Sequence, residues 1–342
     1  MRLNYFDYFR AIAILFIVAG HSYSVLDIDT IPEKVLTNII TGGTSLFVFI
    51  SGFFFHHVFY KSFNYKKFII KKSKSILIPY LILATVAFFI IVLLLNSPPP
   101  QLLGDKSLNI YLNSIWTGKI LVAYWYIPFI CLVFIASPLF LWFIKLSKIK
   151  QLIIFFIFLF ISMMVHRPLH NMVPFHSLVY FTPIYLLGII FSVNQQKLLG
   201  IIKNKSLILG GGVCVLSFIQ VMLYPHHIGS FHKEVFMSFE GFDLLIIQKI
   251  ALIFFIISIL QKFGGKNIPI LKYIASVSFP IFFIHPWILF VWNWYSLTDY
   301  FMFLPGVFIF IILMSVAFIG SIILANIVKV IFNKNSSYLI GW

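Results

Sequence analysis

The sequence predicts an all-α protein, a polytopic membrane helical bundle with about ten transmembrane helices. Of the 342 residues, 61% are hydrophobic and only 10% are charged, and the mean hydropathy is +1.03. A soluble domain carries roughly a quarter charged residues. Apolar stretches of about 20 residues, the length that a helix needs to cross a bilayer core, recur from end to end. The alternation typical of an outer-membrane barrel is absent.

The apolar stretches define the expected spans in chain order. We place them at 8–26, 39–59, 76–96, 121–144, 152–165, 177–193, 206–224, 243–260, 273–294 and 302–328. The fifth and sixth are short, which favours a kink or a partly interfacial position in one of them. The longest loops, near 97–120 and 225–242, are far too short to form a domain. We therefore expect a single membrane domain over residues 1–342, with no appended soluble domain.

Basic residues fix the expected orientation because they alternate between loops. With the N-terminus inside, the outer loops hold only Lys34, Lys106, Lys119, Arg167 and Lys233. The inner loops hold most of the others, namely Lys61, Lys66, Lys67, Lys71, Lys72, Lys74, Lys145, Lys148, Lys150, Lys197, Lys203, Lys205, Lys262, Lys266, Lys329 and Lys334. This is the positive-inside pattern, and it places both termini in the cytoplasm. The net charge of +16 thus reflects membrane topology, and nucleic acid is not an expected partner.

The first predicted helix carries ionisable residues, which are costly inside a membrane and therefore suggest function. Arg10 and His21 are eleven residues apart, so they lie about 20° apart around the axis and about 16 Å apart along it. Asp7 lies one turn before Arg10 and can pair with it. Imidazole is suited to accept a proton near neutral pH, and a guanidinium can hold a phosphate. The alternative is that Arg10 snorkels to the interface and His21 is a packing residue.

Two further segments are weaker candidates. Ser51 could hydrogen-bond a ligand or a neighbouring helix, and Gly52 lets a backbone approach closely, although packing explains both residues as well. Lys71, Lys72 and Lys74 form a cationic segment that could collar the phosphates of a cytoplasmic donor. The positive-inside rule by itself is the alternative explanation for these lysines.

Several of these motifs together resemble the acyltransferase-3 membrane acyltransferases, typified by bacterial polysaccharide O-acetyltransferases. Residues 5–14 (YFDYFRAIAI) look like the opening motif of that family, and Arg10 and His21 reproduce its spacing. Residues 49–53 (FISGF) and the basic segment before 78–80 (IPY) are similar to later signatures, although this chain has Lys where the family usually has Arg. Residues 124–128 (YWYIP), 181–188 (FTPIYLLG) and 278–286 (SFPIFFIHP) resemble further landmarks.

The resemblance implies roles for individual residues. It implies that His21 is catalytic and that Arg10 takes part in catalysis and in binding the donor, usually acetyl-CoA. Ser51, Lys71, Lys72 and Lys74 are expected to help bind this donor. Trp125, Tyr126 and His285 are expected on the acceptor side. For His285, a structural hydrogen bond is an equal alternative.

Histidines in two outer loops are the remaining polar candidates. His166 and His170 have an i, i+4 spacing that could bind zinc on a helix, but no nearby Cys or carboxylate set completes a site, and we expect no metal. Contact with an acceptor glycan is a second interpretation of the loop histidines, and an ordinary hydrated loop is the third.

We therefore predict an O-acyltransferase that moves an acetyl or other short acyl group from cytoplasmic acyl-CoA to a hydroxyl of an exported polysaccharide or its lipid-linked precursor. The bacterial plasma membrane is the expected location, so membrane lipids are expected partners. His21 would act either as a general base or as an acyl carrier. A transporter or flippase of a lipid-linked saccharide is the main alternative, and a structural subunit or sensor is the third.

Overall fold

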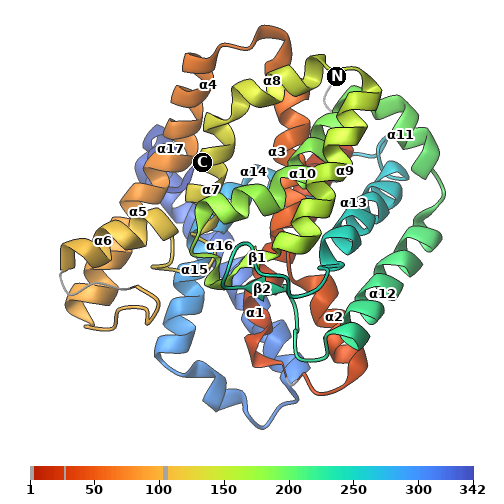
Figure 1. Cartoon of the computed structure of the whole chain (residues 1–342). Coiled ribbons are helices and arrows are strands. Elements are labelled where there is room, and N and C mark those ends of the chain that lie inside the picture. Colours follow the sequence, from red (N-terminus) through yellow and green to blue (C-terminus); the bar gives the residue numbers. More distant parts are fainter. Residues whose placement is uncertain (1–3, 27, 103–106) are drawn as a thin grey trace.

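The computed structural model describes residues 4–26, 28–102 and 107–342, and nearly all of its regular structure is helical (Figure 1). The α-helices are α1 (Asn4–Ser22), α2 (Ile31–Ile40), α3 (Thr44–Phe54), α4 (Tyr65–Lys72), α5 (Ile78–Phe88), α6 (Ser107–Thr117), α7 (Tyr126–Ile135), α8 (Ser137–Lys145), α9 (Lys148–Val165), α10 (Pro174–Val193), α11 (Gln195–Ile202), α12 (Ser206–Leu223), α13 (Leu245–Gln261), α14 (Pro269–Ser276), α15 (Ser278–Trp294), α16 (Gly306–Phe332) and α17 (Ser336–Ile340). Short 3-10 and π turns are η1 (Tyr23–Val25), η2 (Phe55–Phe59), η3 (Tyr60–Ser62), η4 (Ser73–Leu77), η5 (Phe89–Leu94), η6 (Leu169–Asn171), η7 (Leu297–Phe301) and η8 (Asn333–Asn335). The strands β1 (Arg167–Pro168) and β2 (His232–Lys233) have two residues each.

The predicted spans coincide with helices. Within the described residues, seven helices are long and apolar enough to cross a membrane, or up to nine if each of two bent pairs is one span. The eighth predicted span corresponds to α13, an apolar helix of 17 residues. The helical membrane class is thus confirmed, and ten spans remain a prediction. The predicted loop 97–120 also contains a helix, α6, that the sequence reasoning did not anticipate.

Two spans are sharply bent. The axes of α7 and α8 differ by 54°, and those of α14 and α15 differ by 68°. Pro138 and Pro280 lie in the first turn of the second helix of each pair. A proline there has no N–H to continue the preceding helix, and its ring crowds a carbonyl one turn back. Helices α9 and α10 are continuous over 18 and 20 residues, and Pro183 lies inside α10. A kink or a partly interfacial position of the fifth or sixth span stays a prediction.

Helix α1 is the centre of the bundle and packs against α2, α3, α13, α14, α15 and α16. Beside it, α3 and α10 approach each other closely through two glycines. A Cβ atom on Gly52 would strike the carbonyl oxygen of Tyr185, and one on Gly188 would strike that of Phe49. Small residues allow such close contact in membrane bundles, where dispersion replaces the hydrophobic effect as the main packing force.

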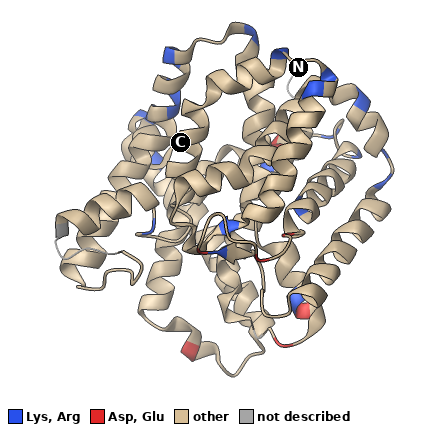
Figure 2. Ribbon diagram, in the orientation of Figure 1, with Lys and Arg blue, Asp and Glu red and all other residues tan. Residues whose placement is uncertain are grey.

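Charge distinguishes the two ends of the bundle. Lys and Arg gather at the end where α4, α8 and the N-terminus lie (Figure 2), and we call it the lysine end. The C-terminal helix α17 packs against α5 and against η4, the turn that contains Lys74. Helix α1 runs from the lysine end to the opposite end, which carries few cations. This distribution agrees with the positive-inside prediction; Lys106 lies outside the described residues.

A two-residue parallel sheet joins two loops near the end of α1 that holds His21. Arg167 pairs with His232, and Pro168 pairs with Lys233. The backbone N–H of Arg167 donates to the carbonyl oxygen of Phe231 over 3.1 Å. The sheet therefore fixes the loop after α9 against the loop before α13, and it places Arg167 beside a histidine that is distant in sequence.

Candidate functional site

Two cavities lie along the predicted polar face of α1. The first, which we call the Arg10 cavity, has a volume of about 270 Å³ and is lined by Arg10, Ser51 and Lys72 among mostly aromatic side chains. The second, which we call the His21 cavity, has a volume of about 500 Å³. The helical spacing therefore predicted correctly that Arg10 and His21 share one face of α1. The two side chains nevertheless open into different cavities.

The break between α14 and α15 holds Arg10 in place. Its Nη2 donates to the carbonyl oxygen of Ala275 over 2.8 Å and to the Ser278 hydroxyl over 3.0 Å. A carbonyl at a helix end lacks an intrahelical partner and is free to accept from a side chain. The bend in the chain thus supplies the acceptors that fix the guanidinium at the mouth of the cavity.

The structure distinguishes among the three predicted lysines, of which Lys72 lines the Arg10 cavity. Its Nζ lies 4.8 Å from the ring centroid of Phe134 and 5.4 Å from that of Phe59. Such cation–π contacts stabilise an ammonium in apolar surroundings. Lys71 and Lys74 are exposed near the same end of the bundle. Lys72 is therefore the lysine best placed to act together with Arg10.

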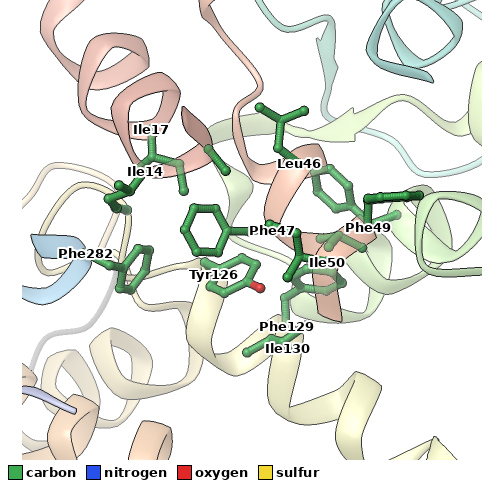
Figure 3. Packing of buried hydrophobic residues seen from close by; sticks show 14 of the residues in the cluster. Ile14, Ile17, Leu46, Phe47, Phe49, Ile50, Tyr126, Phe129, Ile130 and Phe282 are labelled. Carbon is green, nitrogen blue, oxygen red and sulfur yellow. The ribbon is translucent and has the colours of Figure 1, made fainter. Parts of the chain in front are cut away.

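A layer of packed side chains, which we call the septum, separates the two cavities. It consists of Ile14, Phe47, Tyr126 and Phe282, one each from α1, α3, α7 and α15 (Figure 3). All four are at most 6% exposed. The rings of Tyr126 and Phe282 are 5.6 Å apart in a T-shaped contact. The path from Arg10 to His21 is therefore closed here, because apolar residues occupy the same face of α1 between these two polar ones.

The septum is thinnest at α3. There Phe47 lines the Arg10 cavity and Thr44 lines the His21 cavity, a rise of about 4.5 Å for three residues. On α15, the limits of the two cavities are Phe279 and Pro286, a rise of about 10 Å for seven residues. The cavities therefore approach each other most closely at α3. Tyr126 links this layer to the Arg10 side, because its hydroxyl hydrogen-bonds the Ser51 side chain.

His21 lies in the last turn of α1 and lines its cavity. Its ring stacks on that of His285 with a centroid distance of 5.5 Å. His285 is fully buried, and its Nδ1 is 2.9 Å from the carbonyl oxygen of Ile281. A carbonyl only accepts, so Nδ1 carries the proton and Nε2 presents a lone pair. His285 thus packs behind His21, whereas Pro286 next to it lines the cavity.

Two basic residues at the mouth of the His21 cavity were used in the sequence analysis only to predict the orientation of the chain in the membrane. Arg167 and Lys119 line this cavity together with His170 and His232. Burial lowers the pKa of Lys119, and burial next to Arg167 lowers the pKa of His232 to about 3. His232 is therefore neutral at physiological pH. No local motif marks Arg167, because most of its partners, such as Ser230 and Trp125, come from other segments of the chain.

Trp125 orients Arg167. The Arg167 Cζ atom lies 5.0 Å from the ring centroid of Trp125 and 5.7 Å from that of Phe181. The Trp125 and Phe181 rings stack at 6.1 Å. Trp125 also lines the His21 cavity, and its place on the acceptor side stays a prediction. The structure places Tyr126 in the septum instead, with only 5% of its surface exposed.

The described residues hold no group of three or more His, Cys, Asp or Glu side chains that could bind a metal ion. The proposed i, i+4 pairing of His166 and His170 fails because α9 ends at Val165. His166 is buried, and its Nε2 lies 2.8 Å from the carbonyl oxygen of Gly241. His170 instead lines the His21 cavity.

The fold and the two cavities define a multi-pass membrane protein with ionisable side chains aligned along its central helix. Residues 3–326 match the family model described as an acyltransferase domain. The chain therefore belongs to the acyltransferase-3 family and is a membrane acyltransferase. No functionally curated protein and no solved structure matches the chain.

Proposed function

We propose that this acyltransferase moves an acetyl or other short acyl group from cytoplasmic acyl-CoA to a hydroxyl of an exported polysaccharide or its lipid-linked precursor. We place it in the bacterial plasma membrane. One observation carries the proposal. A cationic cavity and a histidine cavity lie along the same face of α1, and the septum divides them. A donor held on one side could thus meet an acceptor on the other.

The donor is proposed to enter at the lysine end. Its phosphates would meet Arg10 and Lys72, and Lys71 and Lys74 would attract them from the exposed surface. Ser51 offers a hydroxyl to the amides of the pantetheine arm. Because the arm is thin, it can enter between helices that exclude the nucleotide. The septum must separate for the thioester to reach His21, so acyl transfer is coupled to opening of this layer.

The chemistry is proposed to take place in the His21 cavity. As a general base, His21 removes the proton from the acceptor hydroxyl while its oxygen attacks the thioester carbonyl carbon. The C–S bond breaks, and the leaving thiolate takes up a proton. As an acyl carrier, the imidazole nitrogen attacks the thioester carbonyl carbon, the C–S bond breaks and the thiolate leaves with a proton. The acceptor hydroxyl then attacks the acyl carbon, the acyl–nitrogen bond breaks, and the released imidazole takes up the hydroxyl proton. His285 acts as a positioning residue in both routes, because its ring stacks on that of His21.

The test is transfer of labelled acetyl from acetyl-CoA to glycan by the purified protein in lipid nanodiscs. We expect His21→Ala to abolish incorporation and His170→Ala, a histidine at the cavity mouth, to retain most of it. Unchanged incorporation in His21→Ala would refute the proposed role of His21. Movement of labelled glycolipid across liposomes without any CoA thioester would point to the flippase alternative.

A further inference from the structure

The His21 cavity has a strongly one-sided charge. Two basic side chains, Arg167 and Lys119, line it, and none of the described lining residues is acidic. Arg and Lys side chains donate hydrogen bonds and accept none. A neutral sugar hydroxyl needs acceptors as well as donors, whereas a carboxylate or phosphate oxygen only accepts. Hydroxyl and amide groups such as Thr44 and Asn293 also line the cavity and can serve sugar hydroxyls, whereas the two basic side chains favour a ligand that also carries anionic oxygen atoms.

The Arg167 side chain is buried in the wall of the His21 cavity and is held by its neighbours. Only 7% of it is exposed, and Trp125 and Phe181 flank its guanidinium. One terminal nitrogen donates to Asn171 Oδ1 over 2.9 Å, and the other donates to the Ser230 hydroxyl. Its Nε is buried and has no partner among the described residues. A buried guanidinium with an unsatisfied N–H gains from a nearby anion, and carboxylates and phosphates are its preferred partners.

The buried acid nearby does not neutralise this charge. Asp243 interacts electrostatically with both Arg167 and Lys249. Its two carboxylate oxygens accept from the Tyr180 hydroxyl over 2.8 Å and from the backbone N–H of Leu245 over 2.9 Å. One carboxylate thus faces two buried basic side chains, Arg167 and Lys249. Since an uncompensated buried charge is costly, Arg167 is poised to gain from an anionic ligand.

The donor does not supply this anion in the proposed reaction. Its phosphates are assigned to Arg10 and Lys72, on the other side of the septum. Arg167 instead shares a cavity with His21. The anion therefore belongs to the molecule whose hydroxyl His21 activates. A volume of about 500 Å³ lies within the range of small-ligand pockets, which is roughly 300–1,000 Å³.

We propose that the acceptor is an anionic saccharide whose carboxylate or phosphate is bound by Arg167 at the mouth of the His21 cavity. This inference rests on the proposed function and deepens it, because it names the substrate class. Lys119, which lines the same cavity, adds long-range attraction. Binding through the anion would leave a ring hydroxyl of the same sugar facing His21.

Binding is tested without any acyl donor, so that its outcome is independent of catalysis. The dissociation constants of methyl glucuronide, glucose 6-phosphate and methyl glucoside are measured by ligand-detected NMR with the full chain in nanodiscs. We expect at least one anionic sugar to bind about tenfold tighter than the glucoside, as charged hydrogen bonds allow. The glucuronide and the phosphate arms distinguish a carboxylate from a phosphate ligand.

Variants then assign the preference to Arg167. Arg167→Gln should bring the affinities of charged and neutral sugars to within about twofold, and Arg167→Lys should retain part of the difference. Lys34→Gln is the matched control, because it removes the same unit charge from α2 at a side chain that does not line the cavity. A preference that persists in Arg167→Gln would overturn the inference.

The affinities measured with the wild-type protein test the inference even if a variant fails to fold. Equal affinity for charged and neutral sugars would overturn the inference while acetyl transfer, measured in parallel, could still support the proposed function. Tight binding of an anionic sugar without acetyl transfer to any saccharide would overturn the acceptor assignment and the proposed function together.

Discussion

Phe47 is the aromatic ring at the centre of the septum, and Phe47→Leu should weaken this layer (Figure 3). Phe47 is 6% exposed and lines the Arg10 cavity, one helical turn from Thr44 at the His21 cavity. Leucine keeps the site apolar but removes three carbon atoms. The matched control is Phe49→Leu, because Phe49 is fully buried on the same helix and packs against Phe9 and Phe191, away from the septum.

The structure sets the expected size of the effect. Truncation of a buried ring by three carbons costs about 1–2 kcal/mol in lost packing, and both variants should lose this much stability. Of these two residues, only Phe47 contributes its packing energy to the closed septum. Its loss therefore lowers the free energy of opening by a similar amount, which corresponds to about 5- to 30-fold more open protein.

The assay is release of free thiol from acetyl-CoA in the absence of acceptor, which measures leakage of the thioester to water. We expect this hydrolysis to rise about 5- to 30-fold in Phe47→Leu and to stay near the wild-type rate in Phe49→Leu. Thermal unfolding of both variants provides the check on matched stability. An equal rise in the two variants would refute a gating role for the septum, and so would no rise in either.

Two further predictions concern donor binding and packing. Lys72→Ala should raise the KM for acetyl-CoA about five- to tenfold, because it removes a charged contact to phosphate. Lys74→Ala, at an exposed side chain, should change this KM less than twofold. Steady-state kinetics with varied acetyl-CoA measures both values, and equal effects of the two variants would contradict the assignment of Lys72. Gly52→Ala should lower the melting temperature by several degrees, because the new methyl group strikes the backbone of α10. Gly211→Ala, whose Cβ meets nothing within 4 Å, should leave the melting temperature unchanged or raise it, since Ala is the better helix former. A smaller loss in Gly52→Ala than in Gly211→Ala would show that the α3–α10 contact is looser than described.

The helical membrane class could be predicted from the sequence because its causes are local. An apolar stretch long enough to satisfy its own backbone hydrogen bonds in lipid must be a helix. The same local periodicity placed Arg10 and His21 on one face of α1. The spacing could not reveal the septum, because the side chains that close it come from four different helices.

The neighbours of Arg10 and Arg167 were beyond the reach of local patterns. The acceptors of Arg10 lie at a helix break more than 260 positions away in the chain. Arg167 meets Ser230 and His232 only because a two-residue sheet joins two loops. Nothing in the residues around Arg167 distinguishes it from an ordinary topology-setting cation.

By itself, the sequence determined that this protein is a membrane helical bundle with a cation and an imidazole aligned on its first helix. Tertiary structure alone decided that these groups open into two cavities, that a septum divides them, and that Arg167 joins His21. The physical reason is that helix formation and periodicity depend on neighbours in the chain. The shape and charge of a cavity depend instead on which distant side chains pack together.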